Sequence, residues 1–197
     1  AAVRGFDCGP ANTLLDAWCR RHTGQAFDAD GAWARTGRVR PDLLTRLLAE
    51  PYFERLPPKS TGRDLFSLAW LQAHLDALAP AAEPADVQAT LTALTAQSSA
   101  QAIRDHAPDS RCLLVCGGGA LNDRLMSELA IRLPGVDVRS TTTAGLPPLQ
   151  VEAAAFAWLA RQTMQRETSN LPAVTGARGT RILGAIYPSG PMAGQSR

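Results

Sequence analysis

The fold class is set by residues 113–123, LLVCGGGALND, in which an apolar run ends in three consecutive glycines. Apolar residues then recur at positions 125, 126, 129 and 130, the spacing of one helix face. This order predicts a buried strand, a loop and a helix. Glycine lets backbone N–H groups approach a charged ligand, and the N-terminus of the following helix favours a phosphate. The stretch has neither the Walker pattern nor Gly-x-Gly-x-x-Gly, so a nucleotide loop and a tight turn without a ligand both stay open.

The segments around this stretch predict an α/β architecture. A helix over residues 122–133 joins strands over 112–116 and 136–140, which is the order of a βαβ unit. Period-2 and apolar patterns predict two further strands, over residues 3–7 and 182–186. The remaining expected elements are helices over 12–21, 41–48, 65–78, 85–106 and 150–166, and a loop over 24–37. The residues expected in the core include Leu68, Leu71, Trp158 and Leu159.

The composition is that of an ordinary soluble globular protein. The chain has 197 residues, of which 45% are hydrophobic and 19% charged, and a net charge of +2, which gives no case for a nucleic-acid or membrane partner. No apolar run approaches the roughly 20 residues that span a bilayer. The four cysteines, at positions 8, 19, 112 and 116, lack metal-knuckle spacing. They are expected to be reduced thiols of a cytoplasmic protein, and no metal site is expected.

Six strings occur in one order along the chain: GFDCGPAN at 5–12, PKSTGR at 58–63, DVQATLT at 86–92, CGGG at 116–119, AFAWLA at 155–160, and NLPAVTGA at 170–177 running into LGAIYP at 183–188. Together they resemble the anhydro-N-acetylmuramic acid kinases of the actin-like, hexokinase-like sugar kinase superfamily. The resemblance extends from residue 5 to residue 188. Because one such string can arise by chance and six in order rarely do, the whole set carries the resemblance.

The resemblance implies a fold with two lobes. The expected structure is an actin-like ATPase (ribonuclease H-like) lobe, a mixed sheet flanked by helices, with a remnant of the first lobe. Residues 1–80 would be the end of the first lobe and the inter-lobe connection, residues 81–188 the second lobe, and residues 189–197 a disordered tail. The family's first phosphate loop, a Gly-Thr-Ser-containing hairpin, has no counterpart here, so the chain is expected to be the C-terminal part of such a protein.

The implied function is a kinase of cell-wall recycling. It would use ATP, with Mg2+, to phosphorylate the 6-oxygen of 1,6-anhydro-N-acetylmuramic acid while water opens the anhydro bridge, giving N-acetylmuramic acid 6-phosphate. The expected partners are the amino sugar and ATP, with a homodimer left open. The alternative is a non-catalytic nucleotide- or sugar-binding fragment or degenerate relative. Cys8, where threonine is expected, and Leu121, where a polar side chain is expected, favour that alternative.

The resemblance assigns Asp7 as the catalytic base that takes a proton from the attacking water. On general grounds an aspartate at this place can equally cap the helix that follows. Gly9, Asn12 and Glu152 are the expected substrate-binding residues. Helix capping is the alternative for Asn12, and a first-turn contact with the helix dipole is the alternative for Glu152.

The resemblance assigns the adenosine and phosphate region to Gly117, Gly118, Gly119 and Asn122. The polar residues of the string at 58–63 have two possible roles. Lys59, Ser60 and Arg63 either contact phosphate or pin an exposed turn, and the turn is the favoured interpretation.

Overall fold

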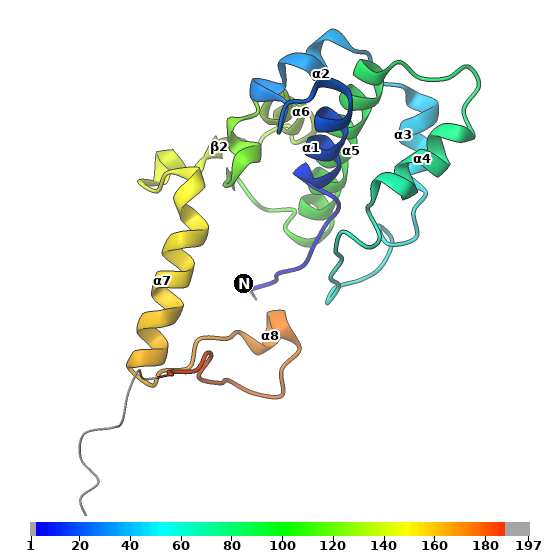
Figure 1. Ribbon diagram of the computed structural model, residues 1–197. Coiled ribbons are helices and arrows are strands. Elements are labelled where there is room, and N and C mark those ends of the chain that lie inside the picture. Colours follow the sequence, from blue (N-terminus) through cyan, green and yellow to red (C-terminus); the bar gives the residue numbers. More distant parts are fainter. Residues whose placement is uncertain (1–2, 188–197) are drawn as a thin grey trace, which may run out of the picture. The chain divides into compact units, whose positions relative to one another are not determined.

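The structure, a computed structural model, describes residues 3–187. Contacts divide the described chain into two units, residues 6–151 and residues 3–5 with 152–187. The larger unit holds α1 (Asn12–Thr23), α2 (Ala32–Thr36), α3 (Pro41–Leu48), α4 (Leu68–Asp76), α5 (Pro84–His106), β1 (Cys112–Val115), α6 (Asp123–Arg132) and β2 (Asp137–Ser140) (Figure 1). Short 3₁₀ helices cover Ala29–Gly31, Gly118–Leu121, Thr141–Ala144 and Pro148–Gln150. The smaller unit holds most of α7 (Val151–Met164) and α8 (Pro172–Thr175).

Helix α5 is the centre of the larger unit. Every residue from 87 to 96 is buried, and α1, α2, α3 and α6 all contact this helix. Its surface is rich in Ala and Thr, whose small side chains allow neighbouring helices to approach closely. The buried hydroxyls of Thr90 and Thr92 donate to the backbone carbonyls of Asp86 and Gln88, at 2.7 and 2.9 Å. Back-bonding of this kind satisfies polar groups that would otherwise destabilise a core.

The main hydrophobic core joins elements on both sides of residue 80. Its buried members are Leu14, Leu15, Trp18, Leu43, Leu47, Tyr52, Phe66, Leu71, Val87, Leu91 and Leu94. Helix α4 and helix α5 therefore share one core, although the short Pro80–Pro84 connection lies between them in the sequence. The contacts do not divide the chain at residue 80, and the assignment of residues 1–80 and 81–188 to two lobes stays a prediction.

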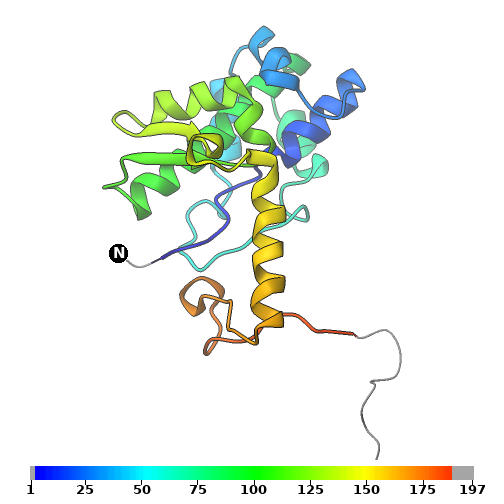
Figure 2. The ribbon, with the colours of Figure 1, turned by 90° about the vertical axis from the view of Figure 1, so that its left-hand side faces the viewer.

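The βαβ unit predicted from residues 112–140 is confirmed, but the expectation that its first strand is buried is wrong, because β1 alternates exposed and half-buried residues. Strands β1 and β2 are parallel, with Cys112 opposite Asp137 and Val115 opposite Ser140. Helix α6 lies along this pair (Figure 2). A second core cluster forms where Leu125 and Leu129 of α6 and Ala96 of α5 meet Leu113, Val115 and Val138 of the strands. Of the four apolar positions that defined the pattern, Leu125 and Leu129 are buried in this cluster, whereas Met126 is half-buried and Ala130 is exposed.

Two of the predicted strands are wrong. Residues 3–7 and 182–186 form no strand, and the sheet in the part of the chain that the structure describes has two parallel strands rather than a mixed order. An apolar or alternating stretch becomes a strand only where a neighbour pairs with its backbone N–H and C=O groups. The expected tail, residues 189–197, lies outside the described residues.

The predicted loop over residues 24–37 is wrong in part, because it contains the 3₁₀ helix Ala29–Gly31 and helix α2. Asp28 explains this local order. Its buried carboxylate accepts hydrogen bonds from the backbone N–H groups of Trp33 and Ala34, at 2.8 and 2.9 Å. Two of the first N–H groups of α2 are thereby satisfied, which is the role of a helix cap.

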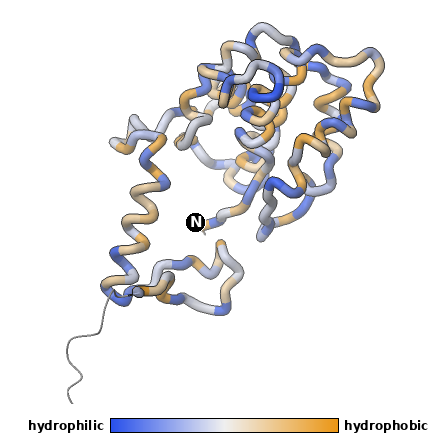
Figure 3. The backbone as a smooth tube through the Cα atoms, viewed as in Figure 1, coloured by the Kyte–Doolittle hydropathy of each residue, from blue (hydrophilic) through white to orange (hydrophobic). Residues whose placement is uncertain are grey.

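In the smaller unit, α7 carries apolar side chains that are exposed. The exposed fractions are 63% for Phe156, 48% for Trp158 and 70% for Met164, and Figure 3 shows hydrophobic residues along much of this helix. The expectation that Trp158 belongs to the core is therefore wrong for the structure. The loop that follows α7 is held by Asn170, whose side chain bonds the carbonyl of Gly179 and the N–H of Arg181. Among residues 3–187, no helix has the length and apolar character needed to cross a bilayer.

Candidate functional site

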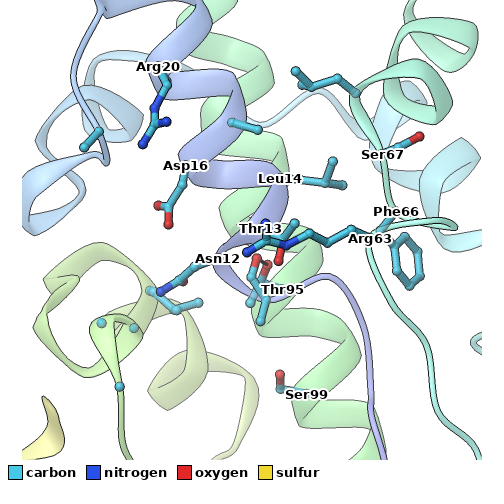
Figure 4. Close-up of a pocket in the computed structure, with 18 of the residues that line it drawn as sticks. Asn12, Thr13, Leu14, Asp16, Arg20, Arg63, Phe66, Ser67, Thr95 and Ser99 are labelled. Carbon is cyan, nitrogen blue, oxygen red and sulfur yellow. Dashed lines mark hydrogen bonds between the residues drawn. The ribbon is translucent and has the colours of Figure 1, made fainter.

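The larger unit contains a cavity of about 1020 Å³. Its walls are α1 along most of its length, the segment from residue 63 to residue 68, parts of α5 and α6, and the glycine loop that follows β1 (Figure 4). Pockets for small molecules and cofactors commonly measure about 300–1,000 Å³. The cavity therefore has room for a nucleotide-sized ligand, and its position places the glycine loop in the wall.

Helix α1 presents one polar face to the cavity. Asn12, Asp16 and Arg20 follow one another at four-residue spacing and project from the same side of the helix (Figure 4). Asn12 does not cap α1, since the N-cap residue is Ala11 and no side chain caps this end. The amide of Asn12 instead lies beside the glycine loop, where a Cβ added to Gly118 would be 3.3 Å from its Nδ2. Its location supports the expected substrate contact, which stays a prediction.

Gly117, Gly118 and Gly119 all line the cavity. Gly117 has a φ of 71°, in the left-handed region that favours glycine, and its N–H donates to the carbonyl of Pro148 at 2.9 Å. Gly118 begins the 3₁₀ helix Gly118–Leu121. The backbone conformation of Gly117 therefore favours glycine at this position. Gly118 and Gly119 instead lie close to the side chain of Asn12.

Three other expected site residues do not line this cavity. Asn122 is buried and caps α6, its Oδ1 accepting from the N–H of Leu125 at 3.0 Å. Gly9 packs against α5, since a Cβ there would lie 2.8 Å from Oγ of Ser98. Glu152 belongs to the smaller unit and is exposed in the first turn of α7. Each of the three residues thus has a structural position outside the cavity. The binding roles of Asn122, Gly9 and Glu152 stay predictions.

Asp7 is exposed and also lies outside the cavity lining. Its carboxylate does not cap α1, because Oδ2 accepts from Oγ of Ser60 at 2.8 Å and from the N–H of Thr61 at 3.0 Å. Segment 60–61 leads directly into Arg63, which does line the cavity. The acid and the cavity are thus joined by one short piece of chain.

The favoured turn interpretation fits Lys59, whereas Ser60 bonds to the carboxylate of Asp7 and Arg63 does not hold the turn. Nζ of Lys59 donates to the carbonyls of Tyr52 and Phe53, at 3.3 and 3.1 Å, and so pins the turn. Arg63 instead extends its guanidinium toward the start of α1 at Thr13 (Figure 4). Within residues 3–187, the structure gives its side chain no hydrogen bond or ion pair, which leaves a cation free to meet an anionic ligand.

Asp16 lines the cavity but is not among the site residues expected from the sequence. Partial burial raises the pKa of its carboxyl group, and the neighbouring charge of Arg20 opposes that rise. The signal that would have found it is the spacing of four from Asn12, which puts both side chains on one face of a helix.

The shifted pKa of Asp16 predicts how stability depends on pH. An acid whose pKa is higher in the folded than in the unfolded state stabilises the fold below the unfolded pKa, and this contribution is lost as pH rises through the folded pKa. Asp16→Asn removes this dependence, because asparagine is neutral throughout. The melting temperature of the variant relative to the native chain is therefore expected to be higher at pH 7 than at pH 3. Equal differences at the two pH values, measured by circular dichroism, would contradict the burial of this carboxyl group.

The four cysteines are free thiols in the structure, and Sγ of Cys8 lies 3.7 Å from Oγ of Ser99, a cavity residue. In residues 3–187 there is no group of three or more His, Cys, Asp or Glu side chains placed to hold a metal ion. Among the described residues that line the cavity, Asp16 carries a carboxylate. Mg2+ is commonly held through one or two carboxylates plus substrate phosphates.

Comparison with known proteins gives one consistent result. The family model for anhydro-N-acetylmuramic acid kinase matches residues 1–189. A protein of that name from Variovorax paradoxus (strain S110) is 62% identical over 190 residues, which cover 95% of this chain and 50% of the relative. Relatives of the same name from Albidiferax ferrireducens and Bordetella pertussis are 59% and 58% identical, over 95% and 94% of this chain and 48% and 50% of their own lengths. The chain spans about half the length of the curated relatives it matches.

Proposed function

The chain belongs to the anhydro-N-acetylmuramic acid kinase family, and from this we propose that it contributes to an active site that phosphorylates 1,6-anhydro-N-acetylmuramic acid with ATP. The observation that carries the proposal is the cavity of about 1020 Å³ that Gly117–Gly119, Asn12 and Arg63 all line. It combines a glycine backbone for a nucleotide with polar side chains for a sugar. The relatives' name supplies the class of substrate.

In the proposed reaction, water attacks the anomeric carbon and the bond from that carbon to the bridging 6-oxygen breaks. The 6-oxygen forms a bond to the γ-phosphorus of ATP, and ADP leaves. The proton of the attacking water passes to the carboxylate of Asp7. The products are N-acetylmuramic acid 6-phosphate, ADP and a proton. Because such a reaction needs the water, sugar and phosphate in line, positioning supplies much of the rate enhancement.

The residues of the cavity suit ATP and Mg2+. Backbone groups of Gly117–Gly119 can approach a phosphate or the adenosine without a side chain in between, and Arg63 offers a positive charge. Asp16 is the carboxylate on the cavity wall that can face the magnesium or its water ligands. When bound, Mg2+ supplies charge neutralisation between the phosphate oxygens.

We also propose an actin-like lobe and a cytoplasmic location for this protein. The parallel β1–β2 pair covered by α6 is compatible with an actin-like lobe, since such lobes are α/β structures. The four cysteines form no disulfide in the structure, which is compatible with the proposed cytoplasmic location. The runner-up function is a non-catalytic nucleotide- or sugar-binding unit, which the outward placement of Leu121, 49% exposed, and the thiol of Cys8 favour.

The test uses a joined protein, in which this chain is connected to the part of the Variovorax paradoxus relative that it does not match. We expect ADP release that depends on 1,6-anhydro-N-acetylmuramic acid, and a product whose mass equals that of N-acetylmuramic acid 6-phosphate. The chain alone is measured in parallel. ATP binding without any sugar-dependent turnover in the joined protein would overturn the kinase proposal and favour the binding unit.

Gly118→Val tests the nucleotide loop. The added Cβ would lie 3.3 Å from Nδ2 of Asn12, and the branched side chain would occupy space between the loop and α1. We expect the affinity for ATP to fall at least about tenfold, equivalent to about 1.4 kcal/mol, with the melting temperature nearly unchanged. Isothermal titration calorimetry on the joined protein measures this.

Gly118→Ala is the matched control, because its single methyl group can be accommodated by a small movement of the Asn12 amide. Its effect on ATP affinity should be the smaller of the two. Equal ATP affinity in the native protein and the valine variant would remove the glycine loop from the nucleotide site.

A further inference from the structure

The carboxylate of Asp7 is bound asymmetrically. Both of its hydrogen bonds in the structure end on Oδ2, one from the hydroxyl of Ser60 at 2.8 Å and one from the backbone N–H of Thr61 at 3.0 Å. The two donors come from adjacent residues, so they approach the same oxygen as a pair. In the described structure Oδ1 receives neither of these donors.

The backbone of Asp7 is fixed by the same region of the chain. Its N–H donates to the carbonyl of Lys59 at 3.3 Å, and its carbonyl accepts from the buried hydroxyl of Tyr52 at 2.8 Å. Lys59 in turn donates from Nζ to the carbonyls of Tyr52 and Phe53. Residues 52–61 therefore hold Asp7 at its main chain and at one carboxylate oxygen.

We propose that Ser60 and Thr61 are the positioning residues of the catalytic base, holding Oδ2 of Asp7 so that Oδ1 is presented to the attacking water. This inference rests on the proposed function, because it takes Asp7 as the base. Neither residue touches the substrate in this scheme. They act by fixing the rotation of the carboxylate.

Asp7 is exposed, so packing does not fix the orientation of its carboxylate. An exposed aspartate on an extended segment has several side-chain rotamers, and only some of them direct an oxygen to a given water. A general base has to lie within hydrogen-bond distance of the proton that it removes, and a displacement of about 1 Å can cost about 100-fold in rate. Two donors on one oxygen select one rotamer without covering the other oxygen.

The arrangement also connects the base to the cavity. Thr61 is separated from Arg63 by Gly62 alone, and Arg63 lines the cavity wall. Movement of this segment would shift the donors of Asp7 and the guanidinium together. The sequence alone left two roles open for the string at residues 58–63, phosphate contact or a turn. The proposal adds a third, which is to position Asp7.

The first experiment compares Ser60→Ala, Ser60→Thr and Ser127→Ala in the joined protein. Ser60→Ala removes the hydroxyl donor, and we expect kcat to fall about 10- to 100-fold while KM for ATP and for the sugar changes less than about threefold. Ser60→Thr keeps the hydroxyl and should restore most of kcat. Ser127→Ala removes an exposed hydroxyl that bonds the backbone of α6, and it should leave kcat and KM unchanged.

Each kinetic outcome has a distinct meaning. Native kcat in Ser60→Ala would overturn the positioning role while leaving the kinase proposal intact. A fall that Ser60→Thr does not rescue, or a fall accompanied by a lower melting temperature, would reduce Ser60 to a structural residue. Absence of sugar-dependent turnover in the native joined protein would overturn the proposed function itself.

The second experiment does not depend on activity and uses the 197-residue chain. Amide hydrogen exchange at Thr61 reports the bond from its N–H to Asp7. We expect exchange at Thr61 to be about tenfold faster in Asp7→Ala than in the native chain and in Ser127→Ala, because local opening sets the exchange rate of such amides. Equal exchange rates in all three would show that the carboxylate is not held, and the proposal would fail.

Discussion

Replacing Asp7 with asparagine is expected to lower the turnover of the joined protein at least about 100-fold, the lower range of what a lost general base costs. The amide oxygen of asparagine can still accept the hydrogen bonds from Ser60 and Thr61, so the segment should keep its structure. What the variant loses is the ability to take a proton from water. Turnover is measured by ADP release in the presence of 1,6-anhydro-N-acetylmuramic acid.

Two properties serve as controls for Asp7→Asn, because the substitution should not change them. ATP affinity and melting temperature are expected to match those of the native protein, because Asp7 lies outside the cavity lining and is exposed. Turnover within a few-fold of the native value would remove Asp7 from the role of base. It would also remove the reason to assign positioning residues to it.

The largest effect on stability is expected from Gly37→Ala. A Cβ at Gly37 would lie 2.0 Å from the carbonyl oxygen of Ala85 and 2.7 Å from the backbone nitrogen of Asp86. Both atoms belong to the first turn of α5, the central helix, so neither can move away as a side-chain end could. Overpacking costs typically about 1–3 kcal/mol and occasionally more, and here we expect the upper end of that range or beyond.

Gly62→Ala is the matched control, since a Cβ there meets no atom within 4 Å. In thermal unfolding of the 197-residue chain, Gly37→Ala should lower the melting temperature by roughly 10 °C, given about 2–4 °C per kcal/mol for a chain of this size. Gly62→Ala should change it little. Similar melting temperatures for the two variants would contradict the close approach of residue 37 to α5.

Much of the local structure could be predicted from periodicity. The helix over residues 41–48 matches α3, and the strand, glycine loop and helix of residues 112–133 were found with small errors at their ends. These segments carry their signals within a few residues, as alternation, helical spacing or a starting proline. The strands predicted over residues 3–7 and 182–186 are wrong for the opposite reason. A strand needs a pairing partner elsewhere in the chain, and the segment's own residues do not specify one.

The candidate site was predictable in its parts but not in its assembly. The glycine loop and Asn12 were expected from sequence, and the structure brings them together in one cavity wall. The bond between Asp7 and Ser60 joins residues 53 positions apart. No local pattern reports such a contact, and the same string that supplies Ser60 reads equally well as an exposed turn.

The sequence by itself determined the α/β class, the βαβ unit around residues 113–123 and membership of the family. Those properties depend on short-range periodicity and on the order of strings along the chain. Only the tertiary structure decided that α5, rich in Ala and Thr, is the buried centre, that Trp158 is exposed, and that Asp7 bonds to segment 60–61 rather than to α1. The reason is physical: burial and hydrogen-bond partners depend on how all the elements pack together, and side-chain hydrophobicity along one segment does not specify its neighbours.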